Sequence, residues 1–208
     1  MMAELIRIHS ENPDLKSIQH VAEAMEKGAL VVYPTDTVYA IGCSSSHVKA
    51  IEKVARLKGM KAEKANFALI FHDLRHLADY TKPLDNSTFR LMKKALPGPF
   101  TFILEANNKL TGVFKKKKEI GIRVPDHLIP REIVRVLEKP IITTSIHDDD
   151  EFIEYPSDPA QIYEMMQDQA DIIIDGGYGN NIASTVVDAT KGEMNVVREG
   201  LGNIEEYL

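Results

Sequence analysis

The chain has 208 residues, of which 44% are apolar, so it can fill the core of one substantial domain and is neither disordered nor fibrous. Its formal net charge of −6 disfavours nucleic acid as a partner unless the basic residues gather on one face. No apolar run reaches the roughly 18–20 residues that cross a bilayer, and the N-terminus lacks the pattern of an export signal. A single cysteine excludes an internal disulfide, so we expect a cytoplasmic protein without a membrane partner.

Helical and strand patterns alternate along the whole chain. Apolar residues from Ile18 to Met25 recur at helical spacing, and Gly28 is placed to end that helix before a buried strand at 29–33. The same reasoning predicts helices at 48–58, 85–96, 128–138 and 158–168, and strands at 67–71, 100–104, 119–124, 140–144, 171–174, 184–189 and 194–198. Since no linker divides them, we expect one domain over residues 1–208 with an α/β (α+β) fold, in which helices cover a twisted sheet of parallel and antiparallel strands.

A polar segment, Pro34 to Tyr39, leaves the first of these strands with several hydroxyl groups and one carboxylate. Ligands of α/β proteins bind at loops that follow strand ends, so Thr35, Asp36, Thr37 and Tyr39 are candidate contacts. Threonine and aspartate also form ordinary turns, and this alternative stays open.

Two further segments carry polar groups. Lys58, Lys61 and Lys64 follow the second helix and precede Asn66, which is a pattern suited to binding phosphates. A lysine at a helix C-terminus is also explained by its favourable interaction with the helix dipole. The predicted strand at 141–145 ends in hydroxyl side chains, which again suit either a ligand or a turn.

Runs of like charge are the remaining features. Lys115 to Lys118 form the densest basic run, which predicts either a solvated loop or a patch for nucleic acid. Asp148 to Glu151 form an acidic run, which is either a solvated loop or a set of magnesium ligands. The histidines show no spacing of metal ligands, so no metal site is expected within the protein.

The order of these segments resembles that of the YrdC/YciO family of threonylcarbamoyl-AMP synthase-like proteins, from about residue 13 to residue 200. The segments NFALIF and FTFILEA resemble the YciO branch more than typical YrdC. The matching segments are YPTDTVYAIG, the Lys58-Gly59 turn before NFALIF, LPGPFTFIL, IGIRVPDH, PIITTS, IIIDGG, STVVD and VVREG.

The resemblance implies a YrdC-like fold whose concave basic face binds ATP, L-threonine and bicarbonate. Such proteins make threonylcarbamoyl-AMP and pyrophosphate for the t6A modification of tRNA, and Mg²⁺ accompanies the ATP. In this chemistry the threonine amine captures bicarbonate as a carbamate, whose oxygen then attacks the α-phosphate. The step needs positioning and charge neutralisation and no protein nucleophile. Transfer RNA and double-stranded RNA are further candidate partners.

The resemblance also implies roles for individual residues. An arginine such as Arg123 suits the carboxylate of L-threonine because its planar guanidinium forms two parallel hydrogen bonds. The implied L-threonine contacts are Thr35, Arg123, Thr143 and Ser184. The implied nucleotide contacts are Lys58, Lys61, Asn66, Ser145 and Arg198, of which Lys58 and Ser145 are also the implied catalytic residues.

The chain departs from the family pattern at two motifs. Where YrdC-type enzymes have Lys-x-Arg and Ser-x-Asn, this sequence ends the motifs with Met60 and His147. Losing one charge-assisted hydrogen bond slows a reaction by roughly one to two orders of magnitude. Reduced activity is therefore expected, and whether His147 replaces the asparagine stays open. Two alternatives also stay open, namely an RNA- or ribosome-binding module without adenylate chemistry and adenylation of a different small substrate.

Overall fold

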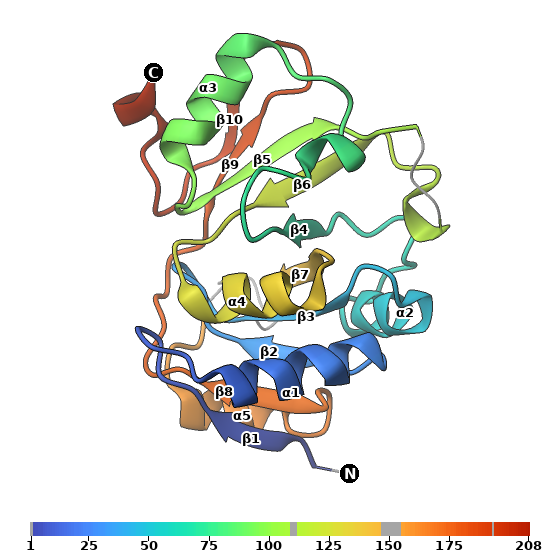
Figure 1. The fold of residues 1–208 in the computed structure, drawn as a ribbon, viewed down its shortest axis with the longest axis vertical. Helices are drawn as coiled ribbons and strands as arrows, with labels where there is room; N and C mark the ends of the chain where they lie inside the picture. Colours follow the sequence, from blue (N-terminus) through green and yellow to red (C-terminus); the bar gives the residue numbers. More distant parts are fainter. Residues whose placement is uncertain (1, 109–111, 147–154, 193) are drawn as a thin grey trace.

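The computed structural model describes residues 2–108, 112–146, 155–192 and 194–208, and these form one mixed sheet with helices packed against it (Figure 1). The strand order is β1-β8-β2-β3-β7-β4-β6-β5-β9-β10. The strands are β1 (Glu4–Arg7), β2 (Val31–Tyr33), β3 (Ala40–Ser44), β4 (Ala68–Ile70), β5 (Phe100–Glu105), β6 (Glu119–Arg123), β7 (Ile141–Ser145), β8 (Ile172–Asp175), β9 (Thr185–Asp188) and β10 (Asn195–Arg198).

The helices confirm the predicted interleaving with strands. They are α1 (Leu15–Glu26), α2 (Val48–Leu57), α3 (Asn86–Ala95), α4 (Leu128–Leu137) and α5 (Pro159–Met166), with short 3₁₀ turns η1 (Leu77–Asp79), η2 (Gly112–Phe114) and η3 (Ile204–Tyr207). Parallel pairs join β8 to β1 and β2, β4 to β6, and β5 to β9, while the other neighbours are antiparallel. The predicted mixed sheet and α/β class are therefore confirmed.

Two strands were not predicted from the sequence. β1 is a short, mostly exposed strand at one edge of the sheet, where its alternation of side chains carries little signal. β3 is buried over all five residues and has the composition AIGCS, which contains only one residue with a high β-propensity. The polar segment from Pro34 to Tyr39 is thus the connection between two antiparallel, hydrogen-bonded strands, β2 and β3.

One face of the sheet changes character along its strands. Val31, Ile70 and Ile141 share a core cluster with residues of α1 and α4, which cover this part of the face (Figure 1). Farther along β7 the same face carries Thr143 and Ser145, because alternate residues of a strand point to the same side. The opposite face belongs to a second cluster that includes residues of α2, α3 and α5. The first face therefore passes from an apolar, covered part to a polar part.

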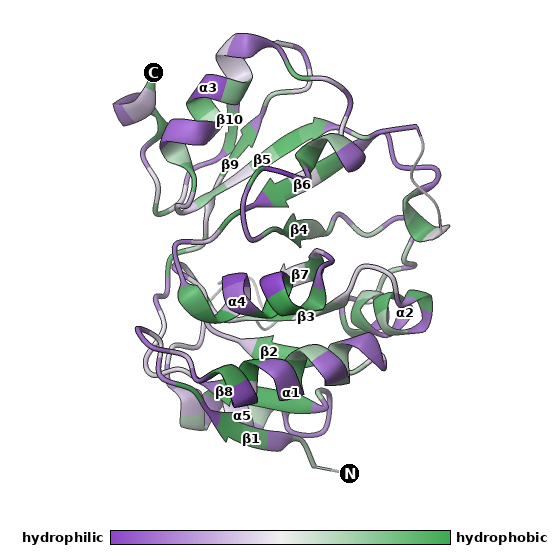
Figure 2. Cartoon of the chain, in the orientation of Figure 1, coloured by the Kyte–Doolittle hydropathy of each residue, from purple (hydrophilic) through white to green (hydrophobic). Residues whose placement is uncertain are grey.

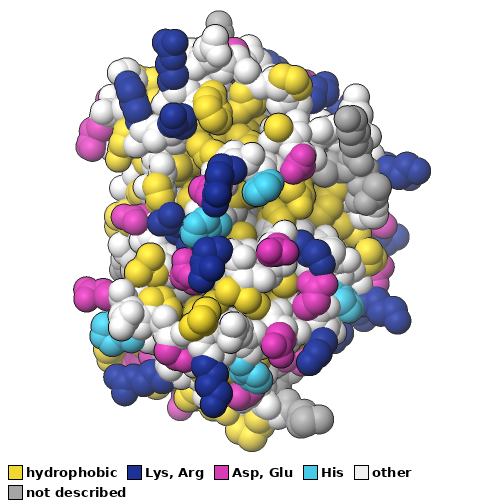
Figure 3. Space-filling model, viewed as in Figure 1, with side chains coloured by type: hydrophobic (Ala, Val, Ile, Leu, Met, Phe, Trp, Pro, Cys, Tyr) yellow, Lys and Arg dark blue, Asp and Glu magenta, His cyan; other side chains and the backbone are white. Residues whose placement is uncertain are grey.

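The distribution of hydrophobic and charged residues agrees with this arrangement of helices on the sheet. In Figure 2, α1 and α4 alternate between hydrophobic and hydrophilic residues, whereas the strands β2 and β8 are mainly hydrophobic. Figure 3 shows basic and acidic side chains interspersed over the face that carries α1 and α4, so neither positive nor negative charge predominates on this face. None of the helices in the described part of the chain has the length and hydrophobicity needed to cross a lipid bilayer.

The middle of β3 is packed without spare room. A Cβ atom on Gly42 would overlap the carbonyl oxygen of Ile142 and lie 2.8 Å from the hydroxyl of Tyr33. That hydroxyl donates a 2.8 Å hydrogen bond to Oγ1 of Thr143, the residue paired with Gly42 across the strands. The neighbouring thiol of Cys43 is fully buried, and burial raises its pKa to about 12.

Replacing Gly42 with alanine is expected to destabilise the fold by about 2–3 kcal/mol, because a methyl group there forces apart backbone and side chains in the centre of the sheet. Chemical denaturation followed by circular dichroism measures the effect. The variant G192A is the comparison, because a Cβ atom on Gly192 meets no neighbouring atom, although its φ of +76° adds backbone strain. Equal stability of G42A and the parent protein would contradict the packing described here.

Candidate functional site

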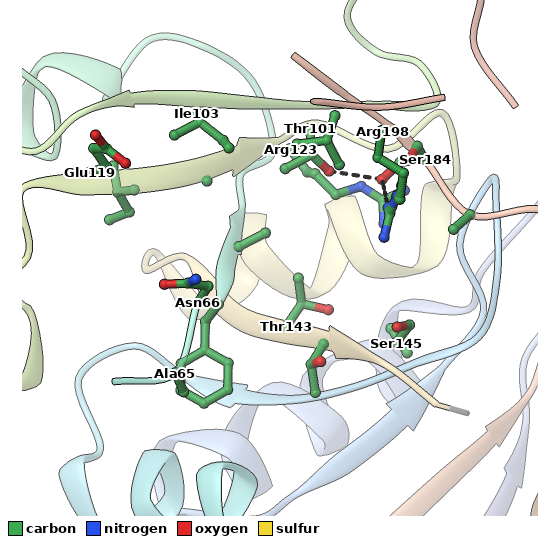
Figure 4. A pocket seen from close by; sticks show the side chains of 18 of the residues that line it. Ala65, Asn66, Thr101, Ile103, Glu119, Arg123, Thr143, Ser145, Ser184 and Arg198 are labelled. Carbon is green, nitrogen blue, oxygen red and sulfur yellow. Dashed lines mark hydrogen bonds between the residues drawn. The ribbon is translucent and has the colours of Figure 1, made fainter. Parts of the chain in front are cut away.

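The polar part of the sheet face forms the wall of a cavity of about 300 Å³ (Figure 4). Its floor contains small residues, because Ala68 of β4 lies between Gly121 of β6 and Thr143 of β7 in the cross-strand register. A larger side chain at any of these positions would occupy the space. The sequence thus leaves this part of the face open by placing small residues where a covered sheet would carry leucine or isoleucine.

Arg123 lies at one end of the cavity and is 6% exposed. Its Nη2 donates to Oδ1 of Asp36 at 2.9 Å and to Oγ1 of Thr37 at 3.0 Å. The second carboxylate oxygen of Asp36 accepts a hydrogen bond from the backbone N–H of Asp126, at 3.0 Å. Asp36 therefore both neutralises and orients the guanidinium. The Nε of Arg123 is buried and finds no acceptor among the described residues, so a hydrogen bond is left to be made.

Three polar side chains from neighbouring strands complete this end of the cavity (Figure 4). The hydroxyls of Thr101 and Ser184 share a hydrogen bond of 2.9 Å. Nη2 of Arg198 donates to the carbonyl oxygen of Ser184 at 2.8 Å and reaches its hydroxyl at 3.4 Å. Two guanidinium groups and two hydroxyls thus gather from β6, β5 and β10 and from the residue just before β9, and this arrangement suits a small ligand with a carboxylate or phosphate group.

The β7 side of the cavity presents two more hydroxyl groups. Thr143 is buried and held by Tyr33, whose own phenol has a raised pKa because it is buried and therefore acts as a fixed neutral donor. Ser145 is half-buried at the end of the strand, opposite Ala40 of β3. Both side chains face the space between the arginines and the far end of the cavity.

The far end of the cavity is more apolar and is lined by one lysine, Lys117. Ala65 and Asn66 precede β4 there, and Glu119 stands on the opposite side (Figure 4). Nζ of Lys117 donates a 2.6 Å hydrogen bond to the carbonyl oxygen of Ala65 and so joins two segments 52 residues apart in the chain. Phe67, Val113, Phe114 and Ile120 also line this end.

Six of the residues implied by the resemblance line this single cavity. They come from the segment before β4, from β6, β7 and β10, and from the approach to β9, and they are Asn66, Arg123, Thr143, Ser145, Ser184 and Arg198. The structure therefore brings together the implied contacts for L-threonine and for the nucleotide, apart from three residues.

The three implied residues that do not line the cavity are Thr35, Lys58 and Lys61. The Thr35 hydroxyl donates to the carbonyl oxygen of Val38 at 2.7 Å and accepts from the N–H of Thr37, so it forms the turn itself. Lys58 ends α2 and its backbone N–H bonds to Ala55, while Lys61 is exposed. His147 and the acidic run 148–151 lie outside the described residues.

Thr101 and Lys117 are among the lining residues that were not singled out for this site. Thr101 alternates with Phe100 and Phe102 along β5, and this alternation places it on the face opposite the buried aromatic rings. Lys117 belongs to a run that was expected to be either a solvated loop or a nucleic-acid patch, and nothing in the spacing of that run distinguishes it from its neighbours. Asp36 was a candidate ligand contact, and in the structure it binds Arg123.

Comparisons with known proteins agree with the motifs. The family model Sua5_yciO_yrdC, described as "Telomere recombination", matches residues 23–200. The YciO protein of Escherichia coli (strain K12) is 37% identical over the full length of both chains, and the crystal structure of E. coli YciO superposes with a TM-score of 0.90 at 36% identity, again over all of both chains.

Two relatives of lower sequence identity are named for an activity or for a bound ligand. The human threonylcarbamoyl-AMP synthase is 29% identical over 86% of this chain and 65% of its own length. The structure of P. abyssi Sua5 complexed with L-threonine has a TM-score of 0.86 at 25% identity, covering 97% of this chain and 59% of the Sua5 chain. With the family model matched over most of its length and full-length relatives above 30% identity, the chain belongs to the Sua5/YciO/YrdC family, which is related to threonylcarbamoyl-AMP synthase.

Proposed function

We propose that the cavity binds L-threonine together with ATP and forms threonylcarbamoyl-AMP and pyrophosphate from these and bicarbonate. The observation that carries the proposal is the state of Arg123. Its guanidinium is held on one side by Asp36 and Thr37 and retains a buried Nε–H without an acceptor among the described residues. A carboxylate entering the cavity supplies that acceptor, and a charge-assisted hydrogen bond of this kind is worth roughly twice a neutral one.

The neighbouring groups fit the rest of an amino acid that carries a hydroxyl. Ser184 and Thr101 lie beside the arginines and offer both donors and acceptors. In the proposed reaction the amine of L-threonine forms a bond to the carbon of bicarbonate, water leaves, and the oxygen of the resulting carbamate attacks the α-phosphate and displaces pyrophosphate. The chain supplies position and positive charge to this step, and it needs no side chain as a nucleophile.

The remaining length of the cavity suits a nucleotide. Ser145 lies between the arginine end and the apolar end, and Asn66 lines the latter, where its side-chain amide offers hydrogen-bond donors and an acceptor to the nucleotide. Mg²⁺ is proposed to bind with the ATP phosphates. In the part of the chain that the structure describes, no three His, Cys, Asp or Glu side chains gather to hold a metal on their own.

The test is a synthesis assay on the protein freed of bound nucleotide. With ATP, L-threonine, bicarbonate and Mg²⁺, threonylcarbamoyl-AMP and pyrophosphate are expected at a rate roughly ten- to a hundredfold below that of a synthase with the full Lys-x-Arg motif, because Met60 replaces the arginine. Omitting bicarbonate is expected to abolish the product. The proposal fails if calorimetry shows no L-threonine binding and the assay shows no product while a synthase control is active.

A different small acid or amine as substrate would leave a distinct pattern. In that case ATP would still raise the melting temperature of the protein, and a member of an amino-acid and metabolite panel other than L-threonine would raise it further. The same panel, followed by an assay for pyrophosphate release, identifies such a substrate directly.

Binding of double-stranded RNA or tRNA is a second candidate function, favoured by the exposed lysines Lys115, Lys116 and Lys118 beside the apolar end of the cavity. The net charge of −6 opposes it. If these lysines bind RNA, affinity falls steeply as salt rises, and the variant with all three changed to glutamine loses most of that salt dependence. Absence of binding at low salt removes this candidate.

A further inference from the structure

Positive charge in the cavity is only partly balanced. Arg123 is paired with Asp36 at 2.9 Å. Lys117 and Arg198 also line the cavity, and neither forms an ion pair with any carboxylate of the described residues, Glu119 included. Arg198 lies beside Ser184 at the arginine end of the cavity, where L-threonine is proposed to bind. Lys117 therefore provides the unbalanced cation at the opposite end.

The inward position of Lys117 follows from its place in the chain. Phe114 and Ile120, three residues before and three residues after it, are both buried. The backbone N–H of Lys117 donates to the carbonyl oxygen of Phe114 at 2.9 Å, which continues the turn of η2. The flanking lysines, Lys115, Lys116 and Lys118, are exposed. One lysine of the run is thus fixed against the cavity wall, while its neighbours extend into solvent.

The ammonium group of Lys117 has donors to spare. A lysine ammonium carries three N–H donors, and the 2.6 Å bond to the carbonyl oxygen of Ala65 uses one of them. Burial lowers the pKa of Lys117, against a smaller opposite effect of Glu63, which shows that the charged group has lost part of its hydration. An anionic ligand in the cavity would replace the lost water with a charge-assisted contact.

We propose that Lys117 binds the phosphate chain of the nucleotide at the Ala65–Asn66 end of the cavity. This inference rests on the proposed function, and it assigns to Lys117 a contact that the sequence suggested for Lys58 and Lys61, neither of which lines the cavity. The arginine expected in the same loop is replaced by Met60, which is 52% exposed. A lysine from the segment between η2 and β6 thus supplies charge where the loop after α2 does not.

Calorimetric titrations with ATP, adenosine and inorganic triphosphate test the assignment. The variant K117M keeps an unbranched stem of similar length and removes the charge, K117R keeps the charge, and K116M removes an exposed lysine of the same run as a matched control. In K117M the Kd for ATP and for triphosphate is expected to rise at least about tenfold, with little change for adenosine. K117R is expected to retain most of the affinity, and K116M is expected to match the parent protein.

Each other outcome has a definite meaning. Equal weakening of ATP and adenosine in K117M shows that Lys117 only shapes the cavity through its bond to Ala65, and unchanged ATP affinity shows that it contacts no phosphate. Either result overturns the inference while leaving the proposed function intact. If the parent protein binds neither ATP nor triphosphate, both fail together. Triphosphate binding that K117M abolishes, without any threonylcarbamoyl-AMP formed, supports the role of Lys117 and rejects the proposed reaction.

The neutral variant must fold for these comparisons. Circular dichroism and the melting temperature check K117M, and K117Q is the second neutral variant, because its side-chain amide still provides a donor for the carbonyl oxygen of Ala65. A loss of ATP affinity shared by K117M and K117Q, restored in K117R, identifies the positive charge as the property that matters.

Discussion

Replacing Arg123 with methionine is expected to abolish L-threonine binding and to lower the free energy of unfolding by about 3–5 kcal/mol, because the change leaves the carboxylate of Asp36 buried without its cation. The ion pair is 8% and 9% exposed at its two side chains. Calorimetry with L-threonine and urea denaturation measure the two effects. An L-threonine affinity that survives in R123M would contradict the role given to Arg123.

A double-mutant cycle separates the pair from the rest of the site. D36N and the double variant D36N/R123M complete the cycle, and the double variant is expected to lose less stability than the sum of the two single changes. The matched control is R75M, which removes an arginine from the exposed pair that it forms with Asp73 at 2.7 Å. Solvent screens that pair, so little change in stability is expected. Additive effects in the Arg123–Asp36 cycle would show that the two side chains are not coupled.

Replacing Ala68 with leucine is expected to block the cavity while leaving the fold in place. Ala68 lies on the floor between Gly121 and Thr143, so the larger side chain occupies the space needed by the ligand. Because the ligand loses part of its space, the affinity for ATP or L-threonine is expected to fall at least about tenfold, which corresponds to about 1.4 kcal/mol. Calorimetry measures the affinities, and the melting temperature reports on the fold.

The control for A68L is A160L, which adds the same side chain at an exposed position of α5, away from the cavity lining. It is expected to bind ligands like the parent protein. Should A68L bind ATP and L-threonine with unchanged affinity, the ligands bind elsewhere and the cavity is not the site.

The sequence predicts the sheet and its helices because most elements have one clearly apolar face. The alternation of Phe100, Thr101 and Phe102 already places threonine on one side of β5 and the aromatic rings on the other. The pattern does not predict β3, because all of its residues are buried and no polar side chain marks a face exposed to solvent. Local periodicity therefore reveals elements that are half-buried better than those in the centre of a sheet.

The site could be predicted only in part, for a different physical reason. A motif indicates which residue types are near a ligand, but the direction of a side chain depends on distant partners. Thr35 turns its hydroxyl to its own loop, while Arg123 is aimed by Asp36, 87 residues away. Among the lysines, the one that lines the cavity is selected by the buried neighbours of Lys117 and not by any property of its run.

The burial of Cys43 has a practical consequence for measuring the dynamics of this fold. Its thiol lies in the middle of β3 and, with a pKa of about 12, is almost entirely protonated at neutral pH. Because the thiolate is the reactive form, a thiol reagent modifies this residue only when the sheet opens. Because Cys43 is the only cysteine of the chain, the rate of its alkylation measures how often the central strands open, and no residue has to be introduced for the measurement. Slower alkylation after ATP or L-threonine is added would show that the ligand stabilises the closed sheet.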